Sequence, residues 1–269
     1  MKSFIKRTAV VMTALIVVSV FLIGCSAPNI ENKTEGPLVI GSDIYSPYFF
    51  LGDDGEFSGI DVDIATEACK RLNLTPVFKE IEWQSKDEYL KNGEVDCLWG
   101  CFTMNGREDF FSWAGPYMHS RQVVVVKASS DIRTLGDLSG KNIAVQNDSK
   151  PEYLFLNNLV DGVTIKKVYT FSTVTMAFTF LKKDYVDACA GHESACIECI
   201  SGISGDYRIL DEVLFSADLG VAFDKDNGSR KAEELSDVLS AMKRDGTIRK
   251  ILDNYDIDVD FALNGGTNK

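Results

Sequence analysis

Short apolar runs alternate with helix-like segments in the first part of the chain. Residues 38–42, 76–80 and 95–99 are short, mostly apolar runs between polar segments, and such runs are typical of buried strands. Between them, residues 62–72 carry apolar side chains at helical spacing and residues 86–92 form a polar segment that also predicts a helix. This alternation indicates an α/β domain with a largely parallel sheet.

The same alternation returns in the second part of the chain. Apolar runs at residues 141–145, 164–168 and 186–190 predict strands, and residues 151–159 and 173–182 predict helices between them. The chain therefore contains two α/β units of similar plan.

Two further apolar runs predict strands that connect these units. Residues 122–127 form a β-branched run suited to a crossing strand, and residues 219–223 are suited to return the chain to the first unit. The fold class predicted is α/β, with two lobes joined by two crossing strands. The predicted organisation is a first lobe of residues 37–123 and 219–260, a second lobe of residues 124–218, and a flexible tail of residues 261–269.

The amino terminus predicts export. Three basic residues within the first seven precede an apolar run over residues 9–23, which is the pattern of a secretory signal. The ending Leu22-Ile23-Gly24-Cys25 resembles the bacterial lipoprotein box, which implies cleavage after residue 24 and lipidation of Cys25. The alternative is an uncleaved membrane anchor, although the run is shorter than the ~20 apolar residues that span a bilayer. In either case the rest of the chain lies outside the cytoplasm, joined to the membrane by a polar tether of residues 25–36.

Composition and charge indicate a globular protein and argue against a nucleic-acid partner. The chain is 45% hydrophobic and 25% charged, as globular proteins are, and its formal net charge is −12. A field of this sign repels phosphate backbones, so we expect no nucleic-acid partner.

Six cysteines follow Cys25, and most stand in apolar contexts typical of buried free thiols. One pair, Cys196 and Cys199, could form a disulfide outside the cytoplasm. Their C-x-x-C spacing, with Cys189 and His192 nearby, leaves a zinc site as an alternative. A helix beginning after His192 would spread these side chains over more than one face, so no metal site is predicted.

Eight short motifs follow one another along the chain, and their order indicates a protein family although each motif alone is weak evidence. Together they resemble family 3 of the bacterial extracellular solute-binding proteins, the polar amino-acid receptors of ABC importers. The resemblance implies a clamshell of two α/β lobes that closes on a small ligand. The motifs are residues 40–48, 59–65, 93–97, 104–108, 111–117, 138–145, 185–188 and 242–247.

The resemblance implies a carboxylate-binding role for Arg107. In the family, the arginine of this motif binds the α-carboxylate of the ligand, and its planar fork of donors suits two parallel hydrogen bonds. Asp43 and Tyr45 follow the first strand at its carboxyl end, where open α/β sheets bind ligands. Asp43 is expected to orient loops or to accept from the ligand, and Tyr45 to stack on it. Trp83 is either an aromatic wall or a packing residue.

The segment of residues 99–103 departs from the family, in which many relatives carry small hydroxyl residues there. Gly100 would let the backbone approach the ligand closely. Trp99 or Phe102 would make the site more aromatic than usual. An uncharged or aromatic ligand side chain suits these residues, whereas Lys150 leaves an acidic one open.

The second lobe is expected to complete the site. Ser149, before a predicted helix, and the first amides of that helix would donate to the same carboxylate. At residue 192 relatives commonly place an aspartate that holds the α-ammonium of the ligand. Here His192 takes that place with Glu193 beside it, so either residue accepts from the ammonium or the ligand lacks an α-amine.

The predicted function is a membrane-tethered, monomeric receptor that passes an amino acid or related carboxylate to an ABC permease. It is predicted to be no enzyme and to need no cofactor. Two alternatives share the scaffold. One is a dehydratase acting on a cyclic carboxylic acid, with His192 or Glu193 as general acid. The other is a ligand-sensing subunit of a signalling receptor.

Overall fold

The computed structural model describes residues 36–266. The predicted signal peptide of residues 1–24, the lipidated Cys25 and nearly all of the tether lie outside the described residues. Within residues 36–266, no helix has the length and apolar content needed to cross a membrane.

The first lobe is built on a short parallel sheet. Strand β1 (Pro37–Ser42) pairs in parallel with β4 (Thr75–Glu80) on one side and with β5 (Cys97–Leu98) on the other. Helix α2 (Ile60–Arg71) connects the hairpin of β2 (Phe50–Leu51) and β3 (Phe57–Ser58) to β4. The short helices η1 (Trp83–Ser85) and α3 (Lys86–Lys91) lead from β4 toward β5.

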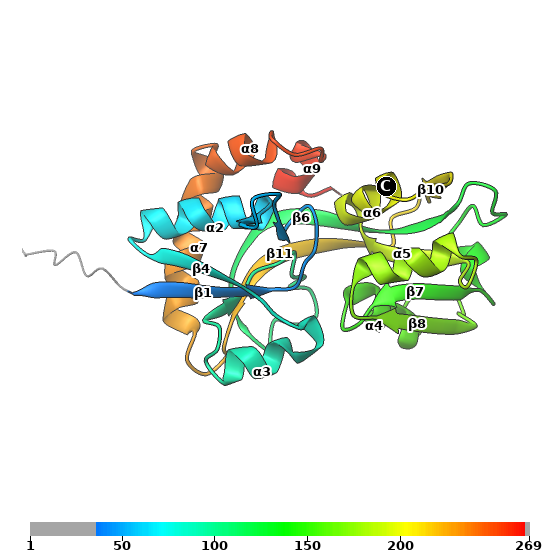
Figure 1. The fold of residues 1–269 in the computed structure, drawn as a ribbon. Helices are drawn as coiled ribbons and strands as arrows, with labels where there is room; N and C mark the ends of the chain where they lie inside the picture. Colours follow the sequence, from blue (N-terminus) through cyan, green and yellow to red (C-terminus); the bar gives the residue numbers. More distant parts are fainter. Residues whose placement is uncertain (1–35, 267–269) are drawn as a thin grey trace, which may run out of the picture. The chain divides into compact units, whose positions relative to one another are not determined.

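Two long antiparallel strands run from one lobe to the other (Figure 1). Strand β6 (Ser112–Lys127) is 16 residues long, and β11 (Phe215–Phe223) pairs with its first part. The crossing strand predicted at residues 122–127 is thus only the end of β6. Its β-branched run is explained by burial on both faces, because Val123 and Val125 pack into one core cluster and Val124 and Val126 into another.

The second lobe continues this sheet in the order β6, β9, β7, β8. Strand β9 (Ala188–His192) is antiparallel to β6 and parallel to β7 (Asn142–Gln146), which is parallel to β8 (Lys167–Phe171). A short strand, β10 (Tyr207–Ile209), also pairs with β6. The helices of this lobe are α4 (Lys150–Leu156), α5 (Val174–Lys182) and α6 (Glu193–Ser201).

Element bounds in this lobe differ from the sequence prediction by up to three residues, most at β8 and α4. The strand expected at residues 164–168 begins at Lys167, because β7 pairs in register from Asn142 opposite Lys167. Ile165 instead packs against the core from the connection before the strand. Helix α4 ends at Leu156, three residues earlier than predicted.

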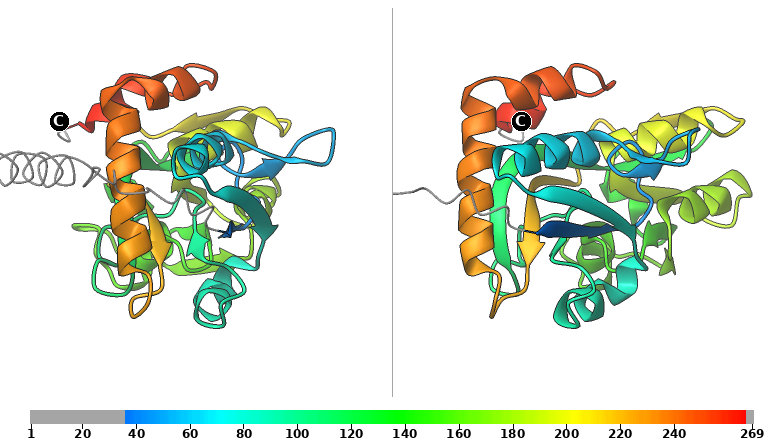
Figure 2. Two further views of the ribbon diagram at one scale, coloured as in Figure 1. Left: turned by 90° about the vertical axis from the view of Figure 1, so that its left-hand side faces the viewer. Right: turned by 60° about the vertical axis from the view of Figure 1, so that its left-hand side comes forward.

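The carboxyl-terminal helices return to the first lobe. Helix α7 (Ser229–Arg244) packs on β6 and β11 and stands at the end of the first lobe that is remote from the second (Figure 2). It is followed by α8 (Thr247–Leu252) and α9 (Val259–Asn264). Residues 261–264, predicted as part of a flexible tail, are therefore helical. Asp258 caps α9, since its side chain accepts a hydrogen bond from the amide of Phe261, and Ala262 is buried.

Candidate functional site

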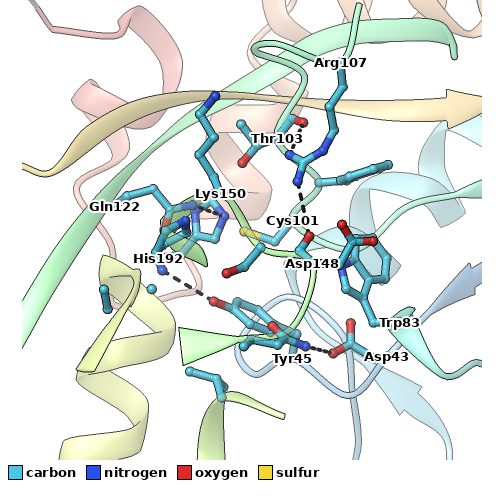
Figure 3. Close-up of a pocket in the computed structure, with 18 residues that line it drawn as sticks. Asp43, Tyr45, Trp83, Cys101, Thr103, Arg107, Gln122, Asp148, Lys150 and His192 are labelled. Atoms are coloured by element: carbon cyan, nitrogen blue, oxygen red, sulfur yellow. Dashed lines mark hydrogen bonds between the residues drawn. The ribbon is translucent and has the colours of Figure 1, made fainter. Parts of the chain in front are cut away.

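A cavity lies where the carboxyl ends of four strands meet, and it is lined by residues of both lobes. Strands β1 and β5 contribute from the first lobe and β7 and β9 from the second, as expected for a ligand site in α/β sheets. Figure 3 shows how ten of the lining side chains lie. Nine of the eleven ligand residues predicted from the sequence line it: Asp43, Tyr45, Trp83, Gly100, Phe102, Arg107, Ser149, Lys150 and His192.

Arg107 reaches the cavity from the turn before β6. Its Nη1 donates to the carbonyl of Thr103 at 3.3 Å and its Nη2 to the carbonyl of Asp148 in the other lobe at 3.2 Å. The guanidinium also lies over the ring of Phe102, with Cζ 5.3 Å from the ring centroid. These contacts occupy one N–H of each terminal nitrogen, so the guanidinium is held in place with donors left for a carboxylate.

Aromatic rings and a buried lysine form the wall beside Arg107. Trp83 and Phe102 meet edge to face with centroids 4.9 Å apart, and both are buried. Lys86 lies 5.2 Å from the Trp83 ring centroid and forms an ion pair with Asp148 of the second lobe. Burial lowers the pKa of Lys86 to about 8. Trp83 thus lines the cavity and also supports the side chains around it.

The end of β1 is linked directly to the second lobe. The amide nitrogen of Gln146, at the end of β7, donates to Asp43 at 2.5 Å. Burial raises the pKa of Asp43 to about 6, although the Gln146 hydrogen bond opposes this shift. The hydroxyl of Tyr45 accepts from the backbone amide of His192 at 3.4 Å. Asp43 and Tyr45 therefore help to hold the lobes together around the cavity.

Ser149 and Lys150 bring the start of α4 to the cavity. Ser149 caps the helix by accepting from the amide of Glu152 at 3.3 Å. Lys150 donates to the carbonyl of Asn105 in the first lobe at 3.1 Å and lies 4.7 Å from the centroid of the Phe215 ring. Its ammonium therefore already serves as a contact between the lobes.

The backbone after β5 is held by a buried carboxyl group. Asp61, on α2 and 1% exposed, accepts from the amide of Cys101 and from the hydroxyl of Tyr117, both at 2.7 Å. Cys101 has a φ of 51°, which a residue with a Cβ adopts at some cost. Asp61 thereby fixes a strained turn whose residues line the cavity.

Gly100 has no room for a side chain. A Cβ there would lie 1.8 Å from the hydroxyl oxygen of Ser42 and 2.7 Å from its Cβ. The glycine predicted to let the backbone approach a ligand is thus required by the close approach of this segment to the end of β1.

Gly100→Ala is expected to lower the free energy of unfolding by about 2 kcal/mol, since overpacking in a tight core costs ~1–3 kcal/mol. The hydroxyl of Ser42 can rotate away, but its Cβ cannot. Ser42→Gly should therefore remove at least half of the added cost in the double variant, measured by urea unfolding of all four proteins. If Gly100→Ala lowers the free energy of unfolding equally in the wild-type and the Ser42→Gly backgrounds, the contact with Ser42 does not explain the cost.

His192 is buried at the end of β9 and makes two side-chain contacts. Its Nδ1 lies 2.9 Å from the Ser120 hydroxyl and its Nε2 lies 2.7 Å from the amide nitrogen of Gln122. Burial, and then the charge of Arg107, lower the pKa of His192 to about 3. The ring is therefore neutral at physiological pH.

This lowered pKa predicts a pH-dependent loss of stability. Between pH 6.5 and pH 3 the unfolded chain binds a proton at residue 192 that the folded chain does not, so stability falls as the pH falls. From pH 7.5 to pH 5.0 the loss at this residue should be about 2 kcal/mol. His192→Gln should lose that much less than the wild type over the same range in urea unfolding. Parallel pH profiles would show that the ring titrates normally in the folded state.

Two residues predicted for the site do not reach the cavity. Trp99 is fully buried beside Tyr117, with ring centroids 5.8 Å apart. Glu193 forms an ion pair with Arg121 at 2.9 Å and lines a separate hollow. In each case the next residue in the chain or the one before it lines the cavity instead: Gly100 follows Trp99, and His192 ends β9 just before Glu193 begins α6.

Sequence reasoning missed further lining residues. Gln146 follows a predicted apolar strand, as Asp43 does. Gln122 is a polar residue at the start of an apolar run. Both residues could therefore have been predicted from the sequence. Cys101 lies in the segment of residues 99–103 that the sequence already places at the site, although nothing in that segment predicts its positive φ. The missed set is Cys101, Thr103, Gln122, Gln146, Asp148, Pro151, Val174, Ala190 and Gly191.

The alternative zinc site gains no support from the described part of the chain. Residues 36–266 contain no group of three or more His, Cys, Asp or Glu side chains placed to hold a metal ion. Cys196 and Cys199 are free thiols, and the Cys189 thiol donates to the carbonyl of Ala177 at 3.2 Å.

The two-lobed α/β fold encloses a cavity at the strand ends, as a solute receptor requires. The sequence model of the bacterial extracellular solute-binding proteins, family 3, matches residues 38–257, and the chain belongs to this family. The fold class and family expected from the sequence are thereby confirmed.

Individual relatives of known specificity are moderately similar. The L-cystine-binding protein TcyJ of Escherichia coli (strain K12) is 24% identical over 227 residues, covering 83% of this chain and 84% of that protein. ABC transporter arginine-binding protein 1 of the same strain is 27% identical over 217 residues, covering 78% and 86%. The histidine-binding periplasmic protein of Salmonella typhimurium is 26% identical over 237 residues, covering 84% and 89%.

Solved structures agree with this assignment. An ancestral arginine-binding protein bound to arginine superposes with a TM-score of 0.75 at 28% identity, covering 83% of this chain and all of that one. The ancestral amino acid-binding protein AncCDT-1, a precursor of cyclohexadienyl dehydratase, has a TM-score of 0.72 at 22% identity over 82% of this chain and 95% of that one. At that identity the second likeness bears on the fold alone.

Proposed function

We propose that this protein binds a free amino acid between its two lobes and delivers it to an ABC importer. The observation that carries the proposal is Arg107, which lies in the interlobe cavity with its guanidinium held by Thr103 and Asp148. Relatives named for binding cystine, arginine and histidine support an amino acid as the ligand. In this proposal Cys25 carries the lipid anchor and the protein acts as a monomer.

The proposed ligand contacts follow from the lining. Arg107 binds the α-carboxylate, with Ser149 as a further donor. Trp83, Phe102 and Tyr45 surround the rest of the ligand with aromatic surface. Asp43, Gly100, Lys150 and His192 complete the proposed site.

We propose further that the protein catalyses no reaction. A dehydratase on this scaffold was expected to use His192 or Glu193 as general acid. His192 is neutral with a pKa of about 3, and Glu193 pairs with Arg121 outside the cavity, which supports a binding role. Incubation of the protein with prephenate should give no product. If prephenate is converted, and Arg107→Ala abolishes the conversion, the protein is an enzyme and the receptor proposal is wrong.

A thermal-shift screen of residues 26–269 tests the proposed function. The panel is the common L-amino acids and L-cystine, their keto acids, and short dicarboxylates. A ligand that binds only the folded state raises the melting temperature with concentration. We expect a clear shift with one or a few amino acids. Shifts with amine-free acids alone, or with none of the panel, would contradict the proposal.

A further inference from the structure

One polar atom of a cavity residue has no partner. The side chain of Gln122, on β6, is 1% exposed, and its oxygen Oε1 accepts no hydrogen bond from any of residues 36–266. Its nitrogen Nε2 lies 2.7 Å from Nε2 of His192. A buried acceptor without a donor destabilises the fold, and such an atom in a residue that lines a ligand cavity is a candidate contact for the ligand.

A buried chain of hydrogen bonds leads to this amide. The Ser194 hydroxyl donates to Tyr48 at 2.8 Å, Tyr48 lies 3.3 Å from Ser120, and Ser120 lies 2.9 Å from Nδ1 of His192. A neutral imidazole has one donor and one acceptor nitrogen. The Gln122 amide nitrogen can only donate, and it faces Nε2 of His192 (Figure 3). Nε2 is therefore the acceptor nitrogen of the ring, Nδ1 donates to Ser120, and the Gln122 oxygen is left without a donor.

The carboxylates nearby already have cationic or amide partners. Asp43 accepts from Gln146, Asp148 pairs with Lys86, and Glu193 pairs with Arg121 outside the cavity. A positively charged group entering beside Arg107 therefore meets the Gln122 oxygen as an acceptor that no protein donor has taken.

We propose that the Gln122 oxygen accepts a hydrogen bond from the α-ammonium of the bound amino acid, and that His192 is the positioning residue that turns the amide toward it. This inference rests on the proposed function and deepens it. The ammonium is bound by a neutral acceptor on the crossing strand, while the carboxylate is bound by Arg107. The ligand class is a zwitterionic α-amino acid. The hydrogen bond to the Gln122 oxygen is the contact by which the protein distinguishes the amino acid from its amine-free analogue.

Titration calorimetry of two Gln122 variants tests the proposal. Gln122→Met keeps the size of the side chain without a strong acceptor, and Gln122→Glu keeps an acceptor oxygen. The probes are L-arginine, L-histidine, L-cystine and any other amino acid that shifts the wild type in the screen, each paired with its deamino analogue. For histidine, for example, this analogue is 3-(imidazol-4-yl)propionate.

Gln122→Met should bind the amino acid about 10–100-fold more weakly than the wild type, since a hydrogen bond to a charged group is worth ~1.5–3 kcal/mol. The deamino analogue should bind both proteins equally within about twofold, and Gln122→Glu should retain amino-acid binding. Equal loss for both ligands, or no loss for the amino acid, would overturn the role of Gln122. If no amino acid binds the wild type, the proposed function itself fails.

The positioning role of His192 has its own test. His192→Phe removes both ring nitrogens and lets the Gln122 amide turn its nitrogen to the cavity, so amino-acid affinity should fall in the wild-type background. In the Gln122→Met background the same change should have no further effect on the ratio of amino-acid to analogue affinity. Additive losses in that ratio would show that His192 does not act through Gln122.

Discussion

Arg107→Ala should reduce the affinity for the amino-acid ligand by at least about 100-fold. Two charge-assisted hydrogen bonds to the carboxylate are lost, each worth ~1.5–3 kcal/mol. The carboxylate would then be buried beside Phe102 without a cation to pair with it. Titration calorimetry with the amino acid found in the screen measures the change directly.

The conservative variant separates charge from geometry at this position. Arg107→Lys keeps the positive charge but not the planar fork, so it should recover only part of the lost affinity and stay at least about tenfold weaker than the wild type. Arg244→Ala is the matched control, because Arg244 is exposed on the last turn of α7, away from the cavity lining. If Arg107→Ala binds the amino acid as tightly as the wild type does, Arg107 does not bind the carboxylate and the receptor proposal loses its main support.

Much of the fold could be predicted because its strands and helices have distinct periodicities. The carboxyl ends of the predicted strands led directly to Asp43, Ser149 and His192, which line the cavity. The first part of β6 could not be predicted in this way. Residues 112–121 include Ser112, His119 and other polar or turn residues, and they form a strand because they pair with β11 far along the chain.

The direction of side chains was harder to predict than the position of the backbone. Residues 121 and 122 of β6 point to opposite faces, and Glu193 begins α6 directly after His192 ends β9. Gln122 and His192 consequently meet beside the cavity, whereas Arg121 and Glu193 meet outside it. From the sequence, only His192 and Glu193 are expected at the site, and the pairing register of β6 with β9 brings Gln122 opposite His192.

The role of Asp61 could not be predicted from the sequence, because it depends on contacts with two segments that lie far from Asp61 in the chain. It connects α2 to the turn at Cys101 and to Tyr117 on β6 through its two carboxyl oxygens. Burial raises its pKa to about 7, while both hydrogen bonds oppose that shift. The folded state therefore binds a proton here that the unfolded state releases above about pH 4.

Asp61→Ala should lower the free energy of unfolding by about 4 kcal/mol, because two buried donors are left without an acceptor at ~1–3 kcal/mol each. Asp61→Asn should lose about 1 kcal/mol, since its oxygen can accept from Cys101 and its nitrogen can donate to Tyr117. Asp63→Ala, on the exposed side of the same helix, is the control and should lose less than about 1 kcal/mol. Urea unfolding at pH 4, where keeping this carboxyl group protonated costs the folded wild type little, measures all three.

The pH dependence of the same variants identifies the cause. Because the folded pKa of Asp61 is raised, the wild type should lose stability relative to Asp61→Asn as the pH rises from about 4 to about 7, and the difference should be constant at higher pH. A pH-independent difference would mean that the carboxyl group is ionised normally in the fold. A loss in Asp61→Ala no larger than in Asp63→Ala would mean that the turn at Cys101, and with it the floor of the cavity, is held by other contacts.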